Sequence, residues 1–337
     1  FPTPEYTEQA HLTHFMRQHG IASFAELMER STREVPWFTD AVLKYLDIRF
    51  STPYAQVVDL SRGIAWPRWC VGGKLNITNN CLDKTLGTPT ENMPAVIAEA
   101  ESGEVTTLTY GELSRQVNQA ANALRQLGLG KGDAIGLFMP MTAEIVVAML
   151  AIAKIGGIIL PLFSGYGAGA VVSRLADADA RALFTADVAF RRGKSIPMKP
   201  IADEAARQVP TLKHMIVLKR SELDTPMEHP RDFWWDDLIT PQATTCPTED
   251  TAAEDTVMII YTSGTTGKPK GAVHTHCGFP VKAAQDMAFG TDVHPGELIY
   301  WMTDMGWMMG PWLVFGALLL GSTFLVFDGA PDYPEAD

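Results

Sequence analysis

The sequence predicts an α/β protein whose sheets are mainly parallel. Two observations support this fold class. From about residue 92, short apolar strands alternate with helices, the order that covers both faces of a parallel sheet with helices. With 46% hydrophobic and 20% charged residues, the composition is that of an ordinary globular protein, and 337 residues suffice for two or three domain-sized units.

Residues 1–80 precede this alternation and are predicted to form an N-terminal extension of helices and loops. Residues 8–20 have the pattern of a helix that ends at Gly20, and residues 34–50 have the pattern of a second helix. Residues 66–84 are rich in Trp, Gly and Asn and show no periodicity, so they are predicted to be an ordered loop.

A first α/β subdomain is predicted over residues 81–245. A β-hairpin opens it, and Thr109 and Glu112 have the spacing of a capping box at the start of a helix that stops at Gly128. The strands and helices expected after it are strands 134–140, 157–163, 182–186 and 214–219 and helices near 142–155, 168–178 and 201–209.

Residues 220–252 are polar and contain proline, so they are predicted to connect this unit to a second α/β subdomain over residues 246–337. The second unit is expected to contain strand 256–260, a helix near 279–289, strand 297–302, a helix near 312–320 and strand 322–327. Only three strands are evident, so we expect its sheet to be incomplete. The expected fold is two stacked, flavodoxin-like parallel α/β subdomains, of which the second is incomplete.

The charge balance excludes several classes of partner. The formal net charge is −12, which is unsuited to binding a nucleic acid backbone or an anionic membrane. The apolar runs 145–163 and 312–327 are interrupted by glycine, and the first also by lysine and proline. We interpret them as buried helix–turn–strand segments rather than membrane spans. With no signal peptide pattern, the prediction is a cytoplasmic protein of unknown oligomeric state.

Four cysteines are scattered along the chain, and none is part of a C-x-x-C pair. A structural zinc site is therefore not expected, and the cysteines are predicted to be reduced thiols. They are Cys70, Cys81, Cys246 and Cys277.

The stretch YTSGTTGKPKG, residues 261–271, directly follows an apolar strand. Its glycines leave backbone N–H groups free, its hydroxyls add donors and its lysines add positive charge, which together suit a chain of phosphates. The glycine spacing and the proline after the first lysine exclude a Walker loop. From composition alone, a polar turn without ligand remains an alternative.

The longer string YTSGTTGKPKGAVHTH resembles the phosphate-binding signature of the adenylate-forming superfamily. Residues 69–84, 139–166, 182–199 and 304–334 are similar to successive blocks of its acetyl-CoA synthetase branch, so the resemblance spans residues 35–334. It implies an AMP-forming acyl-CoA synthetase with ATP, Mg²⁺ and coenzyme A as cosubstrates. Such an enzyme forms acyl-AMP from a carboxylate, releases pyrophosphate and passes the acyl group to coenzyme A.

The resemblance implies that the loop holds the β- and γ-phosphates of ATP and that Thr262 contacts the accompanying Mg²⁺. The residues expected to bind ATP and pyrophosphate are Thr262, Ser263, Gly264, Thr265, Thr266, Gly267, Lys268 and Lys270. The chemistry requires no enzymic nucleophile, so no catalytic residue is assigned within the chain. His274 and His276, although close to the loop, are interpreted as packing residues.

The resemblance also implies where coenzyme A and the acyl group bind. The basic turn FRRGKS is expected to meet the nucleotide end of coenzyme A, with residues Arg191, Arg192 and Lys194. Gly165 is expected to let the pantetheine arm pass, although Ser164 stands where the family usually has glycine. Trp307, Met308 and Met309 are expected at the acyl pocket. Acetate-using relatives have smaller residues than these methionines, so propionate or another short acid competes with acetate as the expected substrate.

In this family, further nucleotide-binding blocks and a mobile C-terminal domain follow the region that the chain resembles. We therefore interpret the chain as an N-terminal part and expect the isolated fragment to be inactive. Three alternatives remain at this stage: a phosphotransferase, a non-catalytic module that binds a nucleotide or coenzyme A, and an adenylation domain that serves another acceptor.

Overall fold

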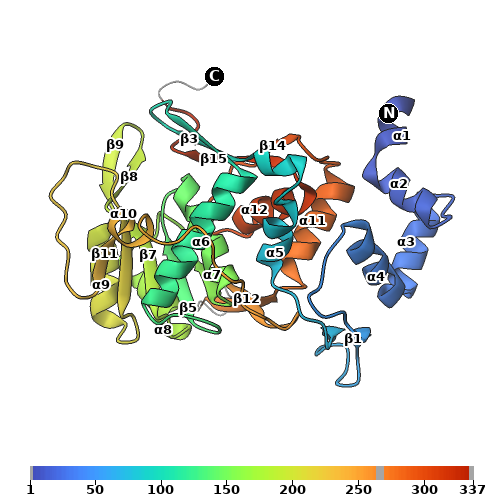
Figure 1. Cartoon of the computed structure of the whole chain (residues 1–337), viewed down its shortest axis with the longest axis horizontal. Helices are drawn as coiled ribbons and strands as arrows, with labels where there is room; N and C mark the ends of the chain where they lie inside the picture. The colour runs from blue at the N-terminus through green and yellow to red at the C-terminus, as the bar shows by residue number, and fades with distance from the viewer. Residues whose placement is uncertain (1–2, 263–268, 334–337) are drawn as a thin grey trace.

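The computed structural model describes residues 3–262 and 269–333, and its strands form two main sheets and two separate hairpins (Figure 1). In the larger sheet, all neighbouring strands are parallel except the last pair. Its strand order is β11 (Asp232–Trp234), β10 (His214–Leu218), β7 (Ala182–Ala186), β5 (Ala134–Phe138), β6 (Ile158–Pro161), β12 (Thr256–Thr262) and β13 (Lys270–Thr275).

The smaller sheet has four strands, of which three are parallel and the last is antiparallel to its neighbour. Its order is β14 (Leu298–Tyr300), β15 (Thr323–Asp328), β3 (Pro94–Ala100) and β4 (Val105–Thr109). The two hairpins are β1 (Gln56–Asp59) with β2 (Arg68–Val71), and β8 (Val188–Arg191) with β9 (Lys194–Pro197). An α/β fold with mainly parallel sheets is thus confirmed.

Helices cover the larger sheet because its strands cross over in both directions from β5. The chain passes from β5 through α7 (Ala143–Lys154) to β6, and then through α8 (Ala168–Asp177) back past β5 to β7. Right-handed crossovers in opposite directions place α7 and α8 on opposite faces of the sheet. The other helices of this unit are α6 (Tyr110–Gln126), α9 (Lys199–Gln208) and α10 (Trp235–Ile239).

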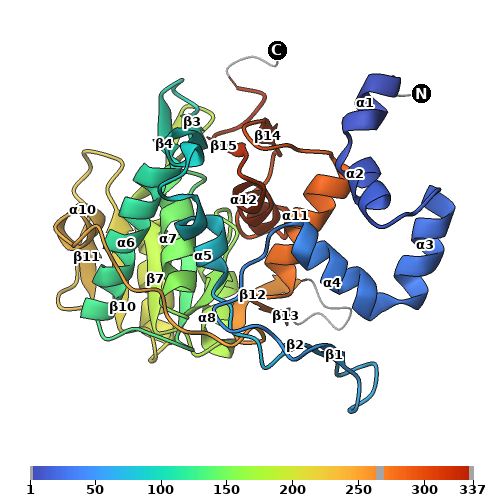
Figure 2. The same ribbon diagram turned by 45° about the vertical axis from the view of Figure 1, so that its right-hand side comes forward.

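The N-terminal helices lie beside α11 (Phe279–Gly290), on the side of the molecule away from β11 (Figures 1 and 2). A backbone N–H of His11 donates to the Asp292 carboxylate at 2.7 Å, which ties this extension to the loop after α11. The remaining helices are α1 (Pro4–Gln9), α2 (His11–Gln18), α3 (Phe24–Arg33), α4 (Val35–Tyr45), α5 (Ile77–Cys81) and α12 (Met309–Leu320), with short 3₁₀ turns at Asp83–Thr85 and Pro89–Asn92.

Several local predictions are confirmed in atomic detail. The Glu112 carboxylate accepts from the Thr109 N–H at 2.9 Å, and the Thr109 hydroxyl accepts from the Glu112 N–H at 3.2 Å, which completes the capping box of α6. Gly128 has φ +77 just beyond this helix, as its role as a stop requires. Within the described residues, no helix combines the length and apolar character needed to cross a membrane.

The assignment of strands to the two subdomains was partly wrong. The predicted first strand of the second unit, β12, pairs with β6 and extends the larger sheet. The predicted opening hairpin, β3 and β4, instead pairs with β15 in the smaller sheet. The predicted division near residue 245 therefore does not coincide with the division between sheets. Local periodicity identifies a strand but does not specify its partner.

The extension and the connector also contain structure that the sequence did not suggest. The helix predicted over residues 8–20 is α2 (His11–Gln18), and residues 8 and 9 instead belong to the preceding helix α1, because the chain is not helical at Ala10. The segment 66–84, predicted to be a loop, contains β2 and α5, and α3 was missed. The predicted connector 220–252 adds β11 to the edge of the larger sheet. The elements β2, α5 and β11 have three to five residues, which carry too few apolar positions to show a period. This reason does not apply to α3, which has ten residues.

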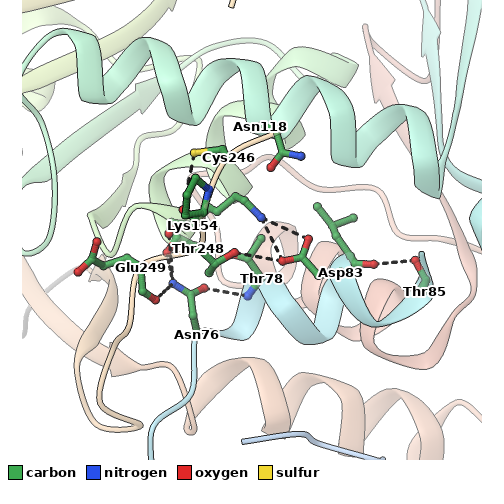
Figure 3. Close-up of polar contacts among 12 residues, drawn as sticks. Asn76, Thr78, Asp83, Thr85, Asn118, Lys154, Cys246, Thr248 and Glu249 are labelled. Carbon is green, nitrogen blue, oxygen red and sulfur yellow. Dashed lines mark hydrogen bonds and ion pairs between the residues drawn. The ribbon is translucent and has the colours of Figure 1, made fainter. Parts of the chain in front are cut away.

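A buried lysine fastens the connector to the core (Figure 3). The side chain of Lys154, at the end of α7, is 2% exposed, and its Nζ lies 3.1 and 3.2 Å from the Asp83 carboxylate oxygens. The Thr248 hydroxyl donates to the same carboxylate at 3.1 Å. The Asn76 amide donates to the carbonyl of Ala153 at 2.9 Å. The lysine is thus satisfied by a counter-ion, as a buried charge requires.

His276 lies just after β13, is fully buried and links this segment to α5. Its Nδ1 accepts a hydrogen bond from the Ile77 N–H at 3.2 Å, which defines the ring as neutral with its proton on Nε2. Burial lowers the pKa of His276 to about 4, and this loss of solvation outweighs the opposing effect of Asp255. The interpretation of this histidine as a packing residue agrees with its geometry.

We predict that His276 makes the fold sensitive to acid. The unfolded chain binds a proton at this ring with a pKa near 6.5, whereas the folded chain binds it near 4, so stability is present above pH 6.5 and is lost as the pH falls toward 4. The free energy of unfolding should fall by about 2 kcal/mol from this group between pH 7 and pH 5.

The test is urea denaturation of His276→Asn at both pH values. Asparagine keeps an acceptor for Ile77 but does not titrate, so the difference between the two pH values should shrink by about the same 2 kcal/mol. An unchanged difference would contradict the assignment.

Candidate functional site

The carboxyl ends of the parallel strands of the larger sheet meet along one edge, where α/β proteins bind their ligands. The pairing of Met258 with Ile159 aligns β12 with β6, so Thr262 and Phe163 leave the sheet at this same edge. Thr262 is exposed and pairs across β12 and β13 with Lys270, which is also exposed. The two ends of the predicted phosphate loop therefore lie at the expected place.

The remaining predicted phosphate residues lie outside the described part of the chain. They are Ser263, Gly264, Thr265, Thr266, Gly267 and Lys268. For Mg²⁺, Thr262 offers one hydroxyl oxygen, and the described residues contain no cluster of three His, Cys, Asp or Glu side chains that could hold a metal. This donor set fits an ion held mainly by substrate phosphates, since Mg²⁺ at nucleotide sites uses only one or two protein ligands.

A cavity of about 430 Å³ lies at the same edge of the sheet, between the turn after β6 and the turn before α12. It brings together one residue predicted for coenzyme A, Arg191, and two predicted for the acyl pocket, Trp307 and Met309. Arg191 thus meets Trp307 and Met309 in one cavity, although they are far from it in the sequence. Met308 does not line the cavity and its side chain is largely exposed.

The two turns that form this cavity are packed at backbone distance. A Cβ atom on Gly306 would lie 2.1 Å from the backbone nitrogen of Phe163, a separation that no side chain can occupy. The rings of Phe163 and Trp307 lie 5.5 Å apart with an interplanar angle of 46°. Glycine at 306 is thus a condition for the contact between the turns.

Gly165 has a similar restriction, in this case against the ring of Phe163. A Cβ atom there would lie 2.6 Å from Cε1 of Phe163, and Gly165 itself is exposed. The backbone is therefore bare at this point, as the prediction for a passing ligand arm requires. This is a property of the turn and does not by itself identify the ligand.

The basic turn presents its cations in different ways. Arg191 lines the cavity and pairs across the β8–β9 hairpin with Lys194, and both are exposed. Arg192 instead pairs with Asp332, with its Nη2 2.6 Å from the carboxylate. The Glu101 carboxylate accepts the backbone N–H groups of Arg192 and Gly193 at 2.9 and 2.6 Å, which lowers the pKa of Glu101 despite some desolvation.

A carboxylate that the sequence reasoning missed, Asp304, also lines the cavity. Its Oδ2 accepts from the Ser164 hydroxyl at 2.6 Å and from the Ser164 N–H at 3.3 Å, and its Oδ1 accepts from the Gly306 N–H at 2.8 Å. Burial raises the pKa of Asp304 above its ordinary value, and the hydrogen bonds from Ser164 and Gly306 only partly oppose this. In the sequence, a single aspartate two positions before Gly306 belongs to no motif or periodic pattern from which its burial could be predicted.

A larger cavity of about 630 Å³ lies next to this one and contains none of the predicted site residues. Asp328 lines both cavities, and the guanidinium of Arg220 lies 2.5 Å from its carboxylate. Burial raises the pKa of Asp328 and Arg220 opposes the shift. Because Arg191, Trp307 and Met309 line the smaller cavity and no predicted site residue lines the larger one, the smaller cavity is the better candidate site.

Comparison with known families gives two matches. The family described as AMP-binding enzyme matches residues 85–337, which include both candidate turns and the loop after β12. The family described as acetyl-coenzyme A synthetase N-terminus matches residues 24–81, which correspond to most of the extension.

Individual relatives match almost the whole chain but only part of their own length. An acetyl-coenzyme A synthetase of Methanothrix thermoacetophila is 40% identical over 340 residues, 99% of this chain and 51% of the relative. One of Chromobacterium violaceum is 37% identical over 338 residues, 99% of this chain and 50% of the relative. A solved structure, acetoacetyl-CoA synthetase from Streptomyces lividans, has a TM-score of 0.91 at 31% identity and covers 99% of this chain and 52% of that one. The chain thus spans about half the length of these relatives.

We predict that Gly306→Ala disrupts the candidate site and destabilises the fold. The added methyl group cannot fit beside the Phe163 backbone, and overpacking of this kind costs about 1–3 kcal/mol of unfolding free energy. Gly169→Ala is the matched control, because a Cβ atom on Gly169 in α8 meets nothing within 4 Å. The control should be neutral or stabilising by up to about 1 kcal/mol.

Urea denaturation of both variants measures the difference. A cost at Gly306 no larger than at Gly169 would show that the two turns can separate freely, contrary to the packing described above.

Proposed function

Because the chain belongs to the family of AMP-binding enzymes, we propose that it is the N-terminal part of an ATP-dependent acyl-CoA synthetase for short carboxylates. The observation that carries the proposal is the cavity that joins Arg191, Trp307 and Met309 at the sheet edge where the loop after β12 begins. The 40% identity to an acetyl-coenzyme A synthetase supports the same reaction class. Under this proposal the two sheets belong to two flavodoxin-like subdomains, and the second is completed by later strands of a longer chain.

In the first step, a carboxylate oxygen attacks the α-phosphorus of ATP and pyrophosphate leaves. The loop 262–270 holds the leaving phosphates with backbone N–H groups, hydroxyls and two lysines, and stabilises the charge that develops there. Mg²⁺, when bound with ATP, neutralises part of the phosphate charge, and Thr262 is its proposed protein ligand. The chain supplies position and charge in this step and no covalent group.

In the second step, the thiol of coenzyme A attacks the acyl carbonyl and AMP leaves. Arg191 and Lys194 bind the phosphate-bearing end of coenzyme A from the exposed hairpin. Arg192 is part of the same turn and a further candidate for this contact. Gly165 leaves room for the pantetheine arm beside Phe163, because no side chain covers the backbone there.

The acyl substrate is proposed to be acetate, propionate or a related short acid. Trp307 and Met309 form part of the cavity wall, and the side chain of Met309 can adjust its shape to the acyl group. Met308 follows Trp307 on the same turn and contributes to the pocket only if its exposed side chain turns inward.

Carboxylate-dependent exchange of pyrophosphate into ATP tests the proposal. The assay uses the longer protein that contains this chain, with a panel of acids from acetate upward, and exchange is expected to be strongest with the two- and three-carbon acids. A phosphotransferase or a non-catalytic binding module would show no exchange. Exchange without acyl-CoA formation would indicate an adenylation domain that serves another acceptor.

We predict that Arg191→Ala in that protein raises the KM for coenzyme A at least tenfold and leaves exchange unaffected. A lost hydrogen bond to a phosphate costs about 1.5–3 kcal/mol, and each 1.4 kcal/mol is a factor of ten. Arg192→Ala should change this KM less than threefold, because its guanidinium is paired with Asp332. Equal effects of the two variants would contradict this division of roles.

A further inference from the structure

Asp304 is a buried carboxylate without a counter-ion. Its side chain is 8% exposed, and among the ion pairs of residues 3–262 and 269–333 none involves it. Two other buried charges have counter-ions: Lys154 is paired with Asp83, and Asp232 with Lys199 and Arg231. Asp187 is also buried without an ion pair among the described residues, but it accepts four hydrogen bonds, whereas Asp304 accepts three and lines a cavity. An isolated buried carboxylate costs stability, and such groups gather where a protein uses them chemically.

Asp304 lines the same cavity as residues of the two predicted binding regions. Arg191, proposed for coenzyme A, and Met309, proposed for the acyl group, line the same space. Ser164 and Gly306, which hydrogen-bond to Asp304, belong to the two turns that form it. A thiol that enters this cavity from the Arg191 side therefore shares the space with this carboxylate.

We propose that Asp304 is the general base of the second step and accepts the proton of the attacking thiol through Oδ1. This inference rests on the proposed function, since it concerns thioester formation at the same cavity. It assigns a catalytic residue to a chain in which the sequence motifs alone indicate none.

The hydrogen bonds leave room for that proton. A carboxylate has about four acceptor positions, two on each oxygen. The N–H and the hydroxyl of Ser164 use both positions of Oδ2, and the Gly306 N–H uses one position of Oδ1. One lone pair of Oδ1 remains, and the other three positions hold the group in a fixed orientation.

The step balances without a further reactant. As the thiol sulfur forms its bond to the acyl carbonyl carbon, the S–H bond breaks and its proton passes to Oδ1 of Asp304. The bond from that carbon to the phosphate oxygen then breaks, and AMP leaves with the electron pair. The carboxylic acid returns its proton to solvent after the thioester departs, so Asp304 is regenerated.

Burial adjusts the basicity of Asp304 to this task. A general base works best when its pKa lies near the working pH, and burial raises the pKa of this carboxylate toward that range. The charged and titratable groups that share the cavity with it are Arg191, Tyr300 and Asp328. Arg191 opposes the rise, and Asp328 is itself paired with Arg220.

Ser164 is a positioning residue in this scheme. It stands where the family pattern has glycine, and its hydroxyl donates to Asp304 at 2.6 Å. Removing that donor raises the pKa of Asp304 further and loosens its orientation. In Ser164→Gly, the pH at which thioester formation reaches half its maximum should therefore move upward, which a purely structural residue would not cause.

The experiment introduces Asp304→Asn into the longer protein that contains this chain and compares the two half-reactions of the variant with those of the unmodified protein. Pyrophosphate exchange reports acyl-AMP formation, and acyl-CoA formation reports the thiol step. Thioester formation should fall at least 100-fold relative to exchange at pH 7, a typical loss for a general base. In this variant, the rate of thioester formation should increase about tenfold for each unit by which the pH is raised, up to the pKa of the thiol, because hydroxide then removes the proton. Trapping of the acyl group by hydroxylamine, which attacks as a neutral amine, should be unaffected.

Asp187→Asn is the matched control. Asp187 is also buried and accepts the N–H and hydroxyl of Ser221 at 3.0 and 2.8 Å, but it does not line the cavity. The ratio of thioester formation to exchange should not change in this variant. If Asp304→Asn lowers both half-reactions together, or if its pH profile matches the unmodified protein, the inference is wrong. Absence of exchange in the unmodified protein would instead refute the proposed function, and the inference with it.

Discussion

The candidate site depends on one steric constraint, the close contact between the Gly306 turn and the Phe163 turn. Phe163 follows a strand of the larger sheet, and Gly306 lies between β14 and α12 of the other unit. Because Gly306 has no side chain, the two backbones approach to a distance that excludes any Cβ atom. The Asp304 carboxylate then bridges both turns through Ser164 and Gly306. The cavity wall is therefore made jointly by the two units, and neither sheet could form it alone.

The sequence predicted well whatever depends on local periodicity or on a dense motif. The helix from Thr109 to Gly128 and the strand 182–186 occur at the predicted positions, because capping, glycine stops and apolar runs act over a few residues. Resemblance to a family placed Arg191 at the predicted coenzyme A region and Trp307 at the predicted acyl pocket, and the two residues line one cavity. Their meeting in one cavity could not be derived from spacing, since 116 residues separate them.

What the sequence could not predict is non-local pairing and burial. Strand β12 looks like the start of a new unit, yet it joins the first sheet because β6 has a free edge. Asp304 and Asp187 are both ordinary aspartates in the sequence, and both are buried in the fold. Only their surroundings distinguish them. The carboxylate oxygens of Asp187 accept the backbone N–H groups of Val188, Arg220 and Ser221 and the hydroxyl of Ser221. Asp304 instead lines a cavity.

An acidic protein can bind polyanionic cosubstrates if its cations are locally ordered. Salt screens the repulsion from the net charge of −12 beyond the Debye length, which is about 8 Å at physiological ionic strength. At the β8–β9 hairpin, Glu101 takes up backbone N–H groups rather than the side chains of the turn. Among the described residues, no ion pair joins Glu101 to Arg191 or Lys194, although the charge of Arg191 contributes to the lowered pKa of Glu101. The same carboxylate also accepts the Ala330 N–H, so the hairpin is held against the end of the smaller sheet, beside the cavity that its arginine lines.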